Sequence, residues 1–337
     1  MKIAIHHSTD SFSFSNRWIQ YFKLKNIKYK IVDCYSNNII QDIDDCDVLM
    51  WHFSNYRVQD TLMARHVLFT AQKMGKRVFP DFETSWHFDD KVAQKYLLES
   101  VGAPMVPSFV FYNKLDTINF LKIAKFPIVF KLRRGSGGNA VKLLNTFKEA
   151  KKIINKAFGK GVPQMDFVSI FYDRIQKYRD GIEPFVAVLK GFSRIFIKSK
   201  FYKTSQPEKG YAYFQEFIPN NLFDIRIIVI GDKAFALKRF VRKNDFRASG
   251  SGNIAYAKEE FDERCVSISF DVSSKLKAQC IAYDYVFDAN NYPLIVEVSY
   301  GFSPDSYDLC KGYWDKNLKW FEGKFNPYGW MIEDILK

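Results

Sequence analysis

The spacing of short apolar runs constrains the fold of this 337-residue chain more than any other sequence feature. Near the N-terminus, apolar runs of strand length alternate with stretches of helix length. The expected strands span residues 2–6, 29–32, 47–53 and 76–79, and the expected helices span residues 17–24 and 61–74. Such alternation predicts an α/β domain with a parallel sheet to about residue 88, in which ligands gather at the carboxyl ends of the strands.

Beyond this region the pattern changes from alternating elements to successive strands. Residues 89–104 predict a helix that begins at an aspartate cap and ends at Gly102, before Pro104. Runs rich in β-branched and aromatic residues then follow at 108–112, 126–132, 140–144, 212–218, 223–231, 233–240, 282–288 and 293–300. They predict antiparallel sheets in two α+β domains. We expect domain boundaries at 1–88, 89–214 and 215–337, with helices and loops between residues 150 and 210.

Composition narrows the class of protein without selecting a function. An aromatic content of 17% argues against disorder, and a net charge of +13 favours anionic partners without choosing among them. The lysine-rich stretches 122–134, 148–160 and 190–203 are also compatible with plain solvated surfaces. The five cysteines lack a Cys-x-x-Cys pair, which predicts reduced, buried thiols. A polar N-terminus and the lack of a long apolar run predict a cytoplasmic protein without a membrane span.

A glycine-rich loop is the first candidate for chemistry. Residues 131–139, KLRRGSGGN, place cationic side chains and flexible backbone between two predicted strands, where N–H groups can wrap phosphates. The loop does not match G-x-x-x-x-G-K-[ST], and an ordinary hairpin explains it equally well when it is taken alone.

Charged residues also interrupt apolar strands further along the chain. Asp224 and Arg226 flank Ile225, so both are expected to project to the same face, opposite the core. Arg239 and the segment 245–249, DFRAS, continue the pattern. A surface ladder of salt bridges is the alternative to a functional site.

Two carboxylates form the third cluster. Asp284 and Glu297 lie in predicted strands joined by the turn 288–291, which can bring them side by side. Adjacent carboxylates repel unless a cation neutralises them, and oxygen ligands suit magnesium. We expect a metal site here, with an ion pair to a neighbouring arginine as the alternative.

In this order the three clusters resemble the ATP-grasp superfamily, in particular the group of ribosomal-protein glutamate ligases and glutathione-synthetase-like enzymes. The resemblance covers residues 89–304 and is carried mainly by the runs 215–218, 224–240, 245–249 and 284–299. It implies a Rossmann-like N-terminal domain followed by two α+β domains that clamp ATP, with Mg²⁺, or Mn²⁺ in its place.

The resemblance also assigns residues. Those implied to contact the nucleotide are Lys91, Lys131, Gly135, Ser136, Gly137, Gly138, Gln215, Glu216, Phe217, Ile218, Asp224, Ala248 and Ser249. Arg226, Arg239 and Arg247 are implied to be catalytic, by stabilising the transferred phosphoryl group and the acyl phosphate. Asp284, Glu297 and Ser299 are implied to bind the metal, although the family has asparagine where this chain has Ser299. A water or Asp305 is a candidate replacement for the missing amide oxygen.

The activity implied by the resemblance is ATP-dependent ligation of a carboxylate to an amine through an acyl phosphate. The acceptor is expected to be a small-molecule or glycan-linked carboxylate, without nucleic acid, in an enzyme that self-associates. His6, His52 and Trp51 are candidates to line the acceptor pocket, or are structural. A phosphotransferase that does not ligate and a basic nucleic-acid-binding protein are the alternative functions.

Overall fold

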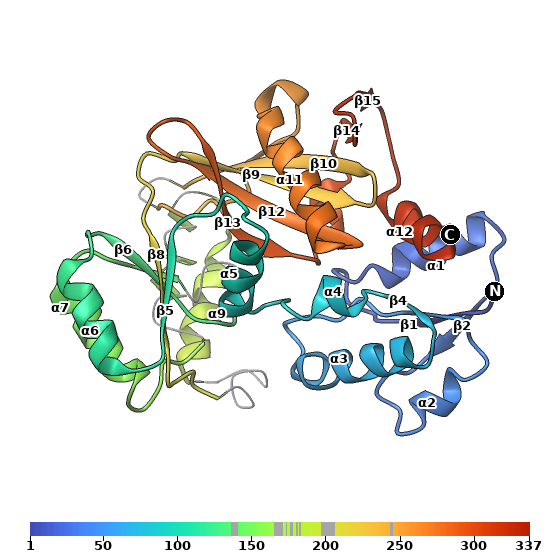
Figure 1. The fold of residues 1–337 in the computed structure, drawn as a ribbon, viewed down its shortest axis with the longest axis horizontal. Helices are drawn as coiled ribbons and strands as arrows, with labels where there is room; N and C mark the ends of the chain where they lie inside the picture. The colour runs from blue at the N-terminus through green and yellow to red at the C-terminus, as the bar shows by residue number, and fades with distance from the viewer. Residues whose placement is uncertain are drawn as a thin grey trace. The chain divides into compact units, whose positions relative to one another are not determined.

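A computed structural model describes residues 1–135, 141–164, 171–172, 174–175, 178–179, 181, 183–196, 206–242 and 245–337. The chain divides into two compact units (Figure 1). Unit 1 comprises residues 1–88, 96–105 and 218–337, and unit 2 comprises residues 89–95 and 106–217. The chain therefore passes from unit 1 to unit 2 and back twice. The division into three domains at 88 and 214 stays a prediction.

The N-terminal part of unit 1 has the predicted parallel sheet. Its strand order is β2-β1-β3-β4, and all three pairings are parallel. The strands are β1 (Ile3–His6), β2 (Tyr29–Val32), β3 (Val48–Met50) and β4 (Arg77–Phe79). The helices between and after them are α1 (Ser15–Leu24), α2 (Ile39–Asp42), α3 (Val58–Lys73) and α4 (Phe82–Ser85). The sequence thus predicted this sheet and its two longer helices correctly.

The second sheet of unit 1 is antiparallel, with the strand order β13-β12-β9-β10-β14-β15, and β11 pairs with β10. Its strands are β9 (Phe223–Ile230), β10 (Lys233–Phe240), β11 (Ile254–Ala255), β12 (Cys280–Phe287), β13 (Pro293–Ser299), β14 (Gly312–Asp315) and β15 (Trp320–Glu322). The associated helices are α11 (Glu263–Leu276) and α12 (Pro327–Leu336), with short 3-10 turns η1 (Lys258–Glu260) and η2 (Pro304–Tyr307). Helix α5 (Lys91–Ser100) begins in unit 2 and ends in unit 1.

Both faces of this antiparallel sheet are buried. Ile225 and Ile227 pack on one side in a core that includes residues of α11, whereas Ile228 and Ile230 pack on the other with residues of β1, α1 and α12. Asp224 and Arg226 alternate with Ile225 and Ile227 along β9 and so share the face of Ile228. The prediction that they share a face is confirmed. The prediction that this face lies opposite the core is wrong, because the sheet has a core on each side.

Unit 2 contains a four-stranded antiparallel sheet with the order β5-β8-β6-β7. The strands are β5 (Ser108–Phe111), β6 (Ile128–Lys131), β7 (Val141–Leu144) and β8 (Ala212–Glu216), and the helices are α6 (Lys114–Ile123), α7 (Phe147–Ala157) and α9 (Phe185–Phe196). Residues of α6 and α7 form one core with alternate residues of β6 and β8. The remaining residues of those strands therefore face away from the two helices.

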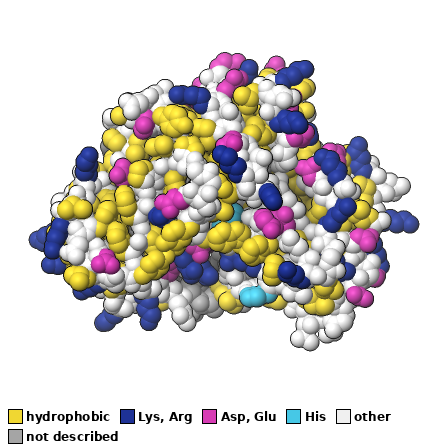
Figure 2. All heavy atoms as spheres, viewed as in Figure 1, with side chains coloured by type: hydrophobic (Ala, Val, Ile, Leu, Met, Phe, Trp, Pro, Cys, Tyr) yellow, Lys and Arg dark blue, Asp and Glu magenta, His cyan; other side chains and the backbone are white. Residues whose placement is uncertain are grey.

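The surface and the cysteines match the composition. Figure 2 shows lysine and arginine side chains scattered over the visible face, with aspartate and glutamate among them. All five cysteines are buried and unpaired, as predicted. None of the helices in the described ranges has the length and apolarity needed to cross a bilayer.

Candidate active site

Five charged residues from four neighbouring strands form one cross-strand array in unit 1. In the strand register, Asp284 of β12 lies opposite Arg226 of β9 on one side and Glu297 of β13 on the other. Arg239 of β10 lies opposite Asp224 of β9. These pairings bring together residues that are up to 73 positions apart, by the difference between 224 and 297. We call these five residues the charged array.

Two arginines neutralise two carboxylates inside the array. Arg226 donates to both oxygens of Asp284, with Nε–Oδ1 and Nη2–Oδ2 distances of 2.5 and 2.7 Å. Arg239 donates to both oxygens of Asp224, at 2.7 and 2.6 Å, and its Nη2 lies 3.0 Å from Asp284 Oδ1. Paired, planar contacts of this kind are strong and hold both groups in fixed orientations. The surface salt-bridge ladder is therefore not what the structure shows, since Arg239 and Asp284 are each only 8% exposed.

The pKa values of the two aspartates are shifted in opposite directions. Burial raises the pKa of Asp284, but attraction by Arg226 and Arg239 outweighs burial and lowers the pKa to about 2. Burial raises the pKa of Asp224, and repulsion by Asp284 adds to it, so that Arg239 does not bring it back to its ordinary value. Of the two aspartates, Asp284 thus remains ionised to the lower pH.

A β-bulge sets the position of Glu297. Tyr285 pairs with Ile295, but Asp284 pairs with Glu297, so Val296 is the extra residue on β13. Ile295 and Val298 lie in the core on the α11 side of the sheet, which leaves Glu297 on the face of Asp284. Without the bulge, Val296 would occupy that place and Glu297 would point into the core. The prediction that the two carboxylates lie side by side is confirmed.

The array fits a divalent cation in residue type and in part in geometry. Asp284 and Glu297 are adjacent oxygen donors of the kind that Mg²⁺ prefers. However, both oxygens of Asp284 accept hydrogen bonds from Arg226, so the ion-pair alternative describes Asp284 in this structure. The Ser299 hydroxyl donates to Gly301 O at 2.9 Å and accepts from Gly301 N at 3.2 Å, within its own turn. Within the described ranges, no group of three or more His, Cys, Asp or Glu side chains is arranged to hold a metal. The metal role of Asp284, Glu297 and Ser299 stays a prediction.

The start of the glycine-rich loop lies in unit 2, at the end of β6. Lys91, which is 3% exposed, donates from Nζ to Gly135 O at 2.7 Å. Gly135 N in turn donates to Asp89 Oδ1 at 3.0 Å. A cationic side chain is therefore held beside the start of the loop, and the contact of Lys91 with the nucleotide stays a prediction. Ser136, Gly137 and Gly138 lie outside the described residues.

Lys131 and Gln215 lie on the sheet face of unit 2 that points away from α6 and α7. Phe130 and Phe214 belong to the core beneath those helices, so their strand neighbours Lys131 and Gln215 face the other way. Both side chains are almost fully buried, and Gln215 Nε2 donates to Ser108 Oγ at 3.1 Å. The chain leaves unit 2 after Phe217 and re-enters unit 1 at Ile218, next to the exposed Glu216. A crossing at this point is what a hinge requires.

The segment 245–249 is a separate, local structure. Arg247 donates from its backbone N and from Nε to Asp245 Oδ1, both at 3.0 Å. Ala248 is buried and Ser249 is half-buried. The catalytic role of Arg247 and the nucleotide contacts of Ala248 and Ser249 stay predictions.

A carboxylate that the sequence analysis missed anchors the glycine-rich loop. Glu208 accepts hydrogen bonds from the backbone N of Arg133 at 3.1 Å and of Arg134 at 3.2 Å. It also accepts from the Tyr211 hydroxyl and from Gln164 Nε2, the latter at 3.1 Å. Its position among proline, glycine and lysine in the segment QPEKG looks like an ordinary turn. No local pattern could have shown that it reaches the loop 74 or 75 residues before it.

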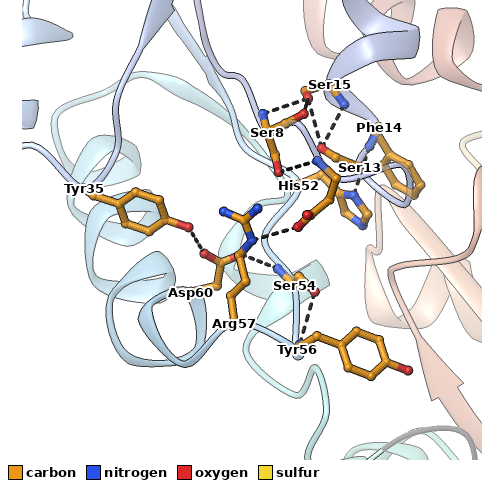
Figure 3. A network of polar contacts seen from close by, with 11 residues as sticks. Ser8, Ser13, Phe14, Ser15, Tyr35, His52, Ser54, Tyr56, Arg57 and Asp60 are labelled. Carbon is orange, nitrogen blue, oxygen red and sulfur yellow. Dashed lines mark hydrogen bonds and ion pairs between the residues drawn. The ribbon is translucent and has the colours of Figure 1, made fainter. Parts of the chain in front are cut away.

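The carboxyl edge of the parallel sheet carries a second polar network (Figure 3). Arg57 Nε donates to Asp10 Oδ2 at 2.7 Å and so connects the loop after β1 to the start of α3. Asp60, 3% exposed, accepts from the Tyr35 hydroxyl and from Ser54 N, the latter at 2.6 Å. Burial raises the pKa of Asp60. The loop after β1 is further fixed by hydrogen bonds among Ser8, Ser13 and Ser15.

His6 and His52 at this edge make structural contacts, and their place in an acceptor pocket stays a prediction. His52 Nδ1 accepts from Phe14 N at 3.0 Å, and its ring stacks on Phe14 at a centroid distance of 3.7 Å. Burial lowers the pKa of His52 to about 3, so its ring is neutral. His6 Nδ1 accepts from Cys34 N at 3.0 Å, and burial also lowers its pKa. Burial therefore favours the neutral form of both rings.

The strand β13 leads from the charged array to this edge within unit 1. Tyr300, which is fully buried, donates its hydroxyl to Phe53 O at 2.6 Å. A Cβ on Gly301 would lie 3.2 Å from His52 Nε2, so glycine allows a close approach here. Glu297 is four residues before Gly301, a span of at most about 14 Å of extended chain. The charged array and the sheet edge are therefore neighbouring parts of one unit.

Comparison with known proteins finds a family model that matches part of this chain. Residues 204–306, which contain the whole charged array, match the RimK-like ATP-grasp domain. The alpha-aminoadipate–LysW ligase LysX of Saccharolobus solfataricus (strain P2) is 20% identical over 278 residues, which are 82% of this chain and 84% of LysX.

Solved structures show the same fold over the whole chain. An ATP-grasp RimK domain protein from Sphaerobacter thermophilus has a TM-score of 0.57 at 12% identity, with 100% of both chains covered. The D-alanine–D-alanine ligase of Bacillus anthracis, complexed with ATP, has a TM-score of 0.57 at 13% identity, with 100% of this chain and 97% of that chain covered.

Proposed function

We propose that this chain is an ATP-grasp ligase that activates a carboxylate with ATP and joins it to an amine, forming a carbon–nitrogen bond. The charged array is the observation that carries the proposal. It gathers two arginines and three carboxylates on one sheet face, entirely inside the segment that matches the family. An apolar strand does not retain such side chains without a reason, because burying a charge is costly.

The proposed reaction has two steps. A carboxylate oxygen attacks the γ-phosphorus of ATP, ADP leaves, and an acyl phosphate forms. The amine then attacks the acyl carbon and forms the C–N bond. The bond between the acyl carbon and the phosphate oxygen breaks, phosphate leaves with its electron pair, and the nitrogen loses a proton. Arg226 and Arg239 are proposed to stabilise the negative charge on the transferred phosphoryl oxygens, since their guanidinium groups are already held in fixed orientations. Bound Mg²⁺, held by Asp284 and Glu297, would add neutralising charge on the phosphates.

Nucleotide binding is proposed to use the residues of unit 2. The buried Lys91 and Lys131 supply positive charge beside the glycine-rich loop, and Glu208 holds the loop's first residues by their backbone N–H groups. Phosphate binding to backbone N–H groups requires that the loop keep its path. The contacts of Lys91 and Glu208 with the backbone of residues 133–135 hold the start of the loop in place.

The acceptor carboxylate is proposed to bind at the edge of the parallel sheet. The strand order β2-β1-β3-β4 places β2 and β3 on opposite sides of β1, so the order in which strands are added reverses there, and crevices form outside the carboxyl ends of such strands. Arg57 lies at this position and is held by Asp10 with its side chain 34% exposed. A guanidinium of this kind recognises a carboxylate by two hydrogen bonds, which supports Arg57 as the residue that selects the acceptor.

The test is an assay with ATP, Mg²⁺, a panel of small carboxylates and hydroxylamine in place of the amine. An acyl phosphate reacts with hydroxylamine to give a hydroxamate, so a ligase yields equal amounts of ADP, phosphate and hydroxamate. A phosphotransferase yields ADP without phosphate, since the phosphoryl group stays on its product. Appearance of ADP alone would exclude ligation.

The Glu297→Gln variant tests the metal role in the same assay. Because the amide is a neutral and weaker cation ligand, the Mg²⁺ concentration for half-maximal rate should rise about tenfold or more. Glu322→Gln, at an exposed position of β15, is the matched control. An unchanged Mg²⁺ requirement in Glu297→Gln would place the metal elsewhere.

A further inference from the structure

Helix α9 packs on its neighbours through one narrow face. Arg174 Nη1 donates to Ala187 O at 2.7 Å, and a Cβ on Gly191 would lie 2.7 Å from Arg174 Cδ and 3.6 Å from Phe171 Cδ2. Val188, between them on the helix, is 9% exposed. The inner face of α9 is thus made of small residues and valine, which leaves its larger apolar residues elsewhere.

Those larger residues lie on the exposed side of the helix. Phe185, Leu189 and Phe192 follow the spacing of four and three that lines one helical face, and they are 53%, 53% and 52% exposed. Val186, beside them, is 56% exposed. Phe185 and Phe192 also contact the rings of Tyr178 and Phe171, yet half of each side chain remains at the surface. We call these four residues the apolar stripe.

Helix α7 of the same unit shows the ordinary arrangement. It buries Ala150, Ile153, Ile154 and Ala157 and exposes Lys151 and Lys152. Single exposed apolar side chains are common on proteins, but a contiguous row of four large ones marks an interaction surface. The apolar stripe of α9 therefore has a different role from the surface of α7.

Positive charge borders the stripe. Lys190 and Arg194 follow Val186 at successive steps of four, so they form a row along one side of the stripe, and both are exposed. The helix sequence FVAVLKGFSRIF contains no aspartate or glutamate. Tyr172, 64% exposed, and Tyr178, 46% exposed, belong to the segment that packs against α9. An apolar row, basic residues on its border and aromatic rings are the features of a helix that lies in a membrane interface.

We propose that α9 binds the surface of an anionic lipid membrane, with the apolar stripe among the acyl chains and Lys190 and Arg194 on the lipid phosphates. An anionic lipid surface satisfies both parts of the helix, since acyl chains take the stripe and phosphates take the cations. The net charge of +13 favours the same partner. Contact of this kind is peripheral, in keeping with the absence of a membrane-spanning helix from the described ranges.

The experiment is co-sedimentation of the full chain with vesicles of phosphatidylcholine, with and without phosphatidylglycerol, and without substrates. The expected result is binding to the phosphatidylglycerol vesicles that weakens as salt is raised, because salt screens surface charge. Equal binding to both vesicle types, or none to either, would overturn the proposal.

Two variants and one control locate the contact. Val186→Ser with Leu189→Ser should weaken vesicle binding at least about tenfold, because two side chains no longer enter the apolar phase. Lys190→Gln with Arg194→Gln should weaken it about fivefold for each charge removed. Lys151→Gln with Lys152→Gln removes the same charge from α7 and should have a smaller effect. An equal effect of the α7 pair would show that net charge, and not α9, causes binding.

Self-association is the competing explanation for an apolar stripe, and sedimentation velocity distinguishes it. If Val186→Ser with Leu189→Ser changes the oligomeric state and leaves vesicle binding unchanged, the stripe binds a second copy and the proposal fails. Hydroxamate formation without vesicles should be unchanged in this variant. Failure of the ligase assay in the wild-type chain would therefore leave the membrane proposal intact, and the reverse also holds.

Discussion

At the scale of single residues, the charged array shows how side chains in apolar strands restrict one another. Asp284 and Arg226 were recognisable from the sequence as charges that need partners. Their partners were not, because the sequence does not give the strand order. Only the register of β9, β10, β12 and β13 shows that Arg226 pairs with Asp284 and Arg239 with both aspartates.

Replacing the single residue Arg57 tests the proposed acceptor site. Arg57→Ala should raise the KM for the carboxylate substrate about tenfold or more, because a charged hydrogen-bond donor to the substrate is lost. The KM for ATP should stay within about twofold, since Arg57 is not among the residues assigned to the nucleotide. Steady-state kinetics with each substrate varied in turn measures both constants.

Arg57→Lys and Asp10→Asn refine that measurement. Lysine keeps the charge but not the two parallel donors, so Arg57→Lys should recover only part of the affinity. Asp10→Asn removes the anion that holds Arg57 and tests whether the orientation of Arg57 matters. A change in the KM for ATP, with the KM for the carboxylate unaltered, would contradict the acceptor assignment.

At the scale of elements, the glycine-rich loop depends on contacts from distant segments. Asp89 and Lys91 at the start of α5 hold Gly135, while Glu208 holds Arg133 and Arg134. The loop between β6 and β7 could be predicted because glycine-rich breaks between strands have a local signature. The anchors could not, since they reach it from more than 40 positions before and more than 70 positions after it.

Glu208→Ala provides the test of this anchoring. Arg134 N and the Tyr211 hydroxyl lose their acceptor, and Arg133 N keeps only the Tyr211 hydroxyl oxygen, so the loop start should become less ordered and ATP should bind several-fold more weakly. The rise in melting temperature that ATP produces should shrink accordingly. Differential scanning fluorimetry over a range of ATP concentrations measures both.

Glu149→Ala is the matched control for Glu208→Ala. Glu149 also accepts a backbone hydrogen bond, from Asn145 N at 2.9 Å, but at the start of α7. It should lower the melting temperature without ATP through the loss of a helix cap, and leave the ATP-induced rise unchanged. Equal shrinkage of that rise in both variants would contradict the role of Glu208.

At the scale of the whole molecule, the periodic patterns were predictable and the pairing between distant segments was not. The parallel strands and the strands β5 to β10, β12 and β13 follow apolar runs that the sequence shows directly. The short strands β14 and β15 were not predicted, because strands of four and three residues carry little pattern. The helix α12 was not predicted either. The two-sided burial of the second sheet was also missed, since alternation alone suggests one solvated face.

Because two histidines are buried, we expect the folded state to lose stability as the pH falls. Burial lowers the pKa of His52 to about 3 and of His87 to about 4, whereas an unfolded histidine titrates near about 6.5. The folded pKa is depressed, so their contribution to stability is complete above about pH 6.5 and is lost as the pH falls towards 4 and 3. Thermal unfolding should therefore show a melting temperature that declines over this range.

The His52→Asn variant tests whether protonation of His52 causes this decline of the melting temperature at low pH. The amide oxygen can still accept the hydrogen bond from Phe14 N, but it does not take up a proton, so the decline should become shallower whatever the variant's stability at neutral pH. The same substitution at the exposed His66 controls for loss of an imidazole. A slope equal to that of the wild type would show that protonation of His52 is not linked to unfolding.

The shared core of unit 1 determines the order in which the chain can fold during synthesis. Ile3, Trp18 and Phe79 pack with Ile228 and Ile332, so one hydrophobic core joins segments made early to segments made 149 to 329 residues later. The core beneath α6 and α7 lies wholly between residues 111 and 214 and can close while translation continues. The face of the parallel sheet that carries Ile3, Ile5 and Val48 packs with these later segments, so its core is complete only after α12 has been made. That face therefore stays partly uncovered on the nascent chain until then.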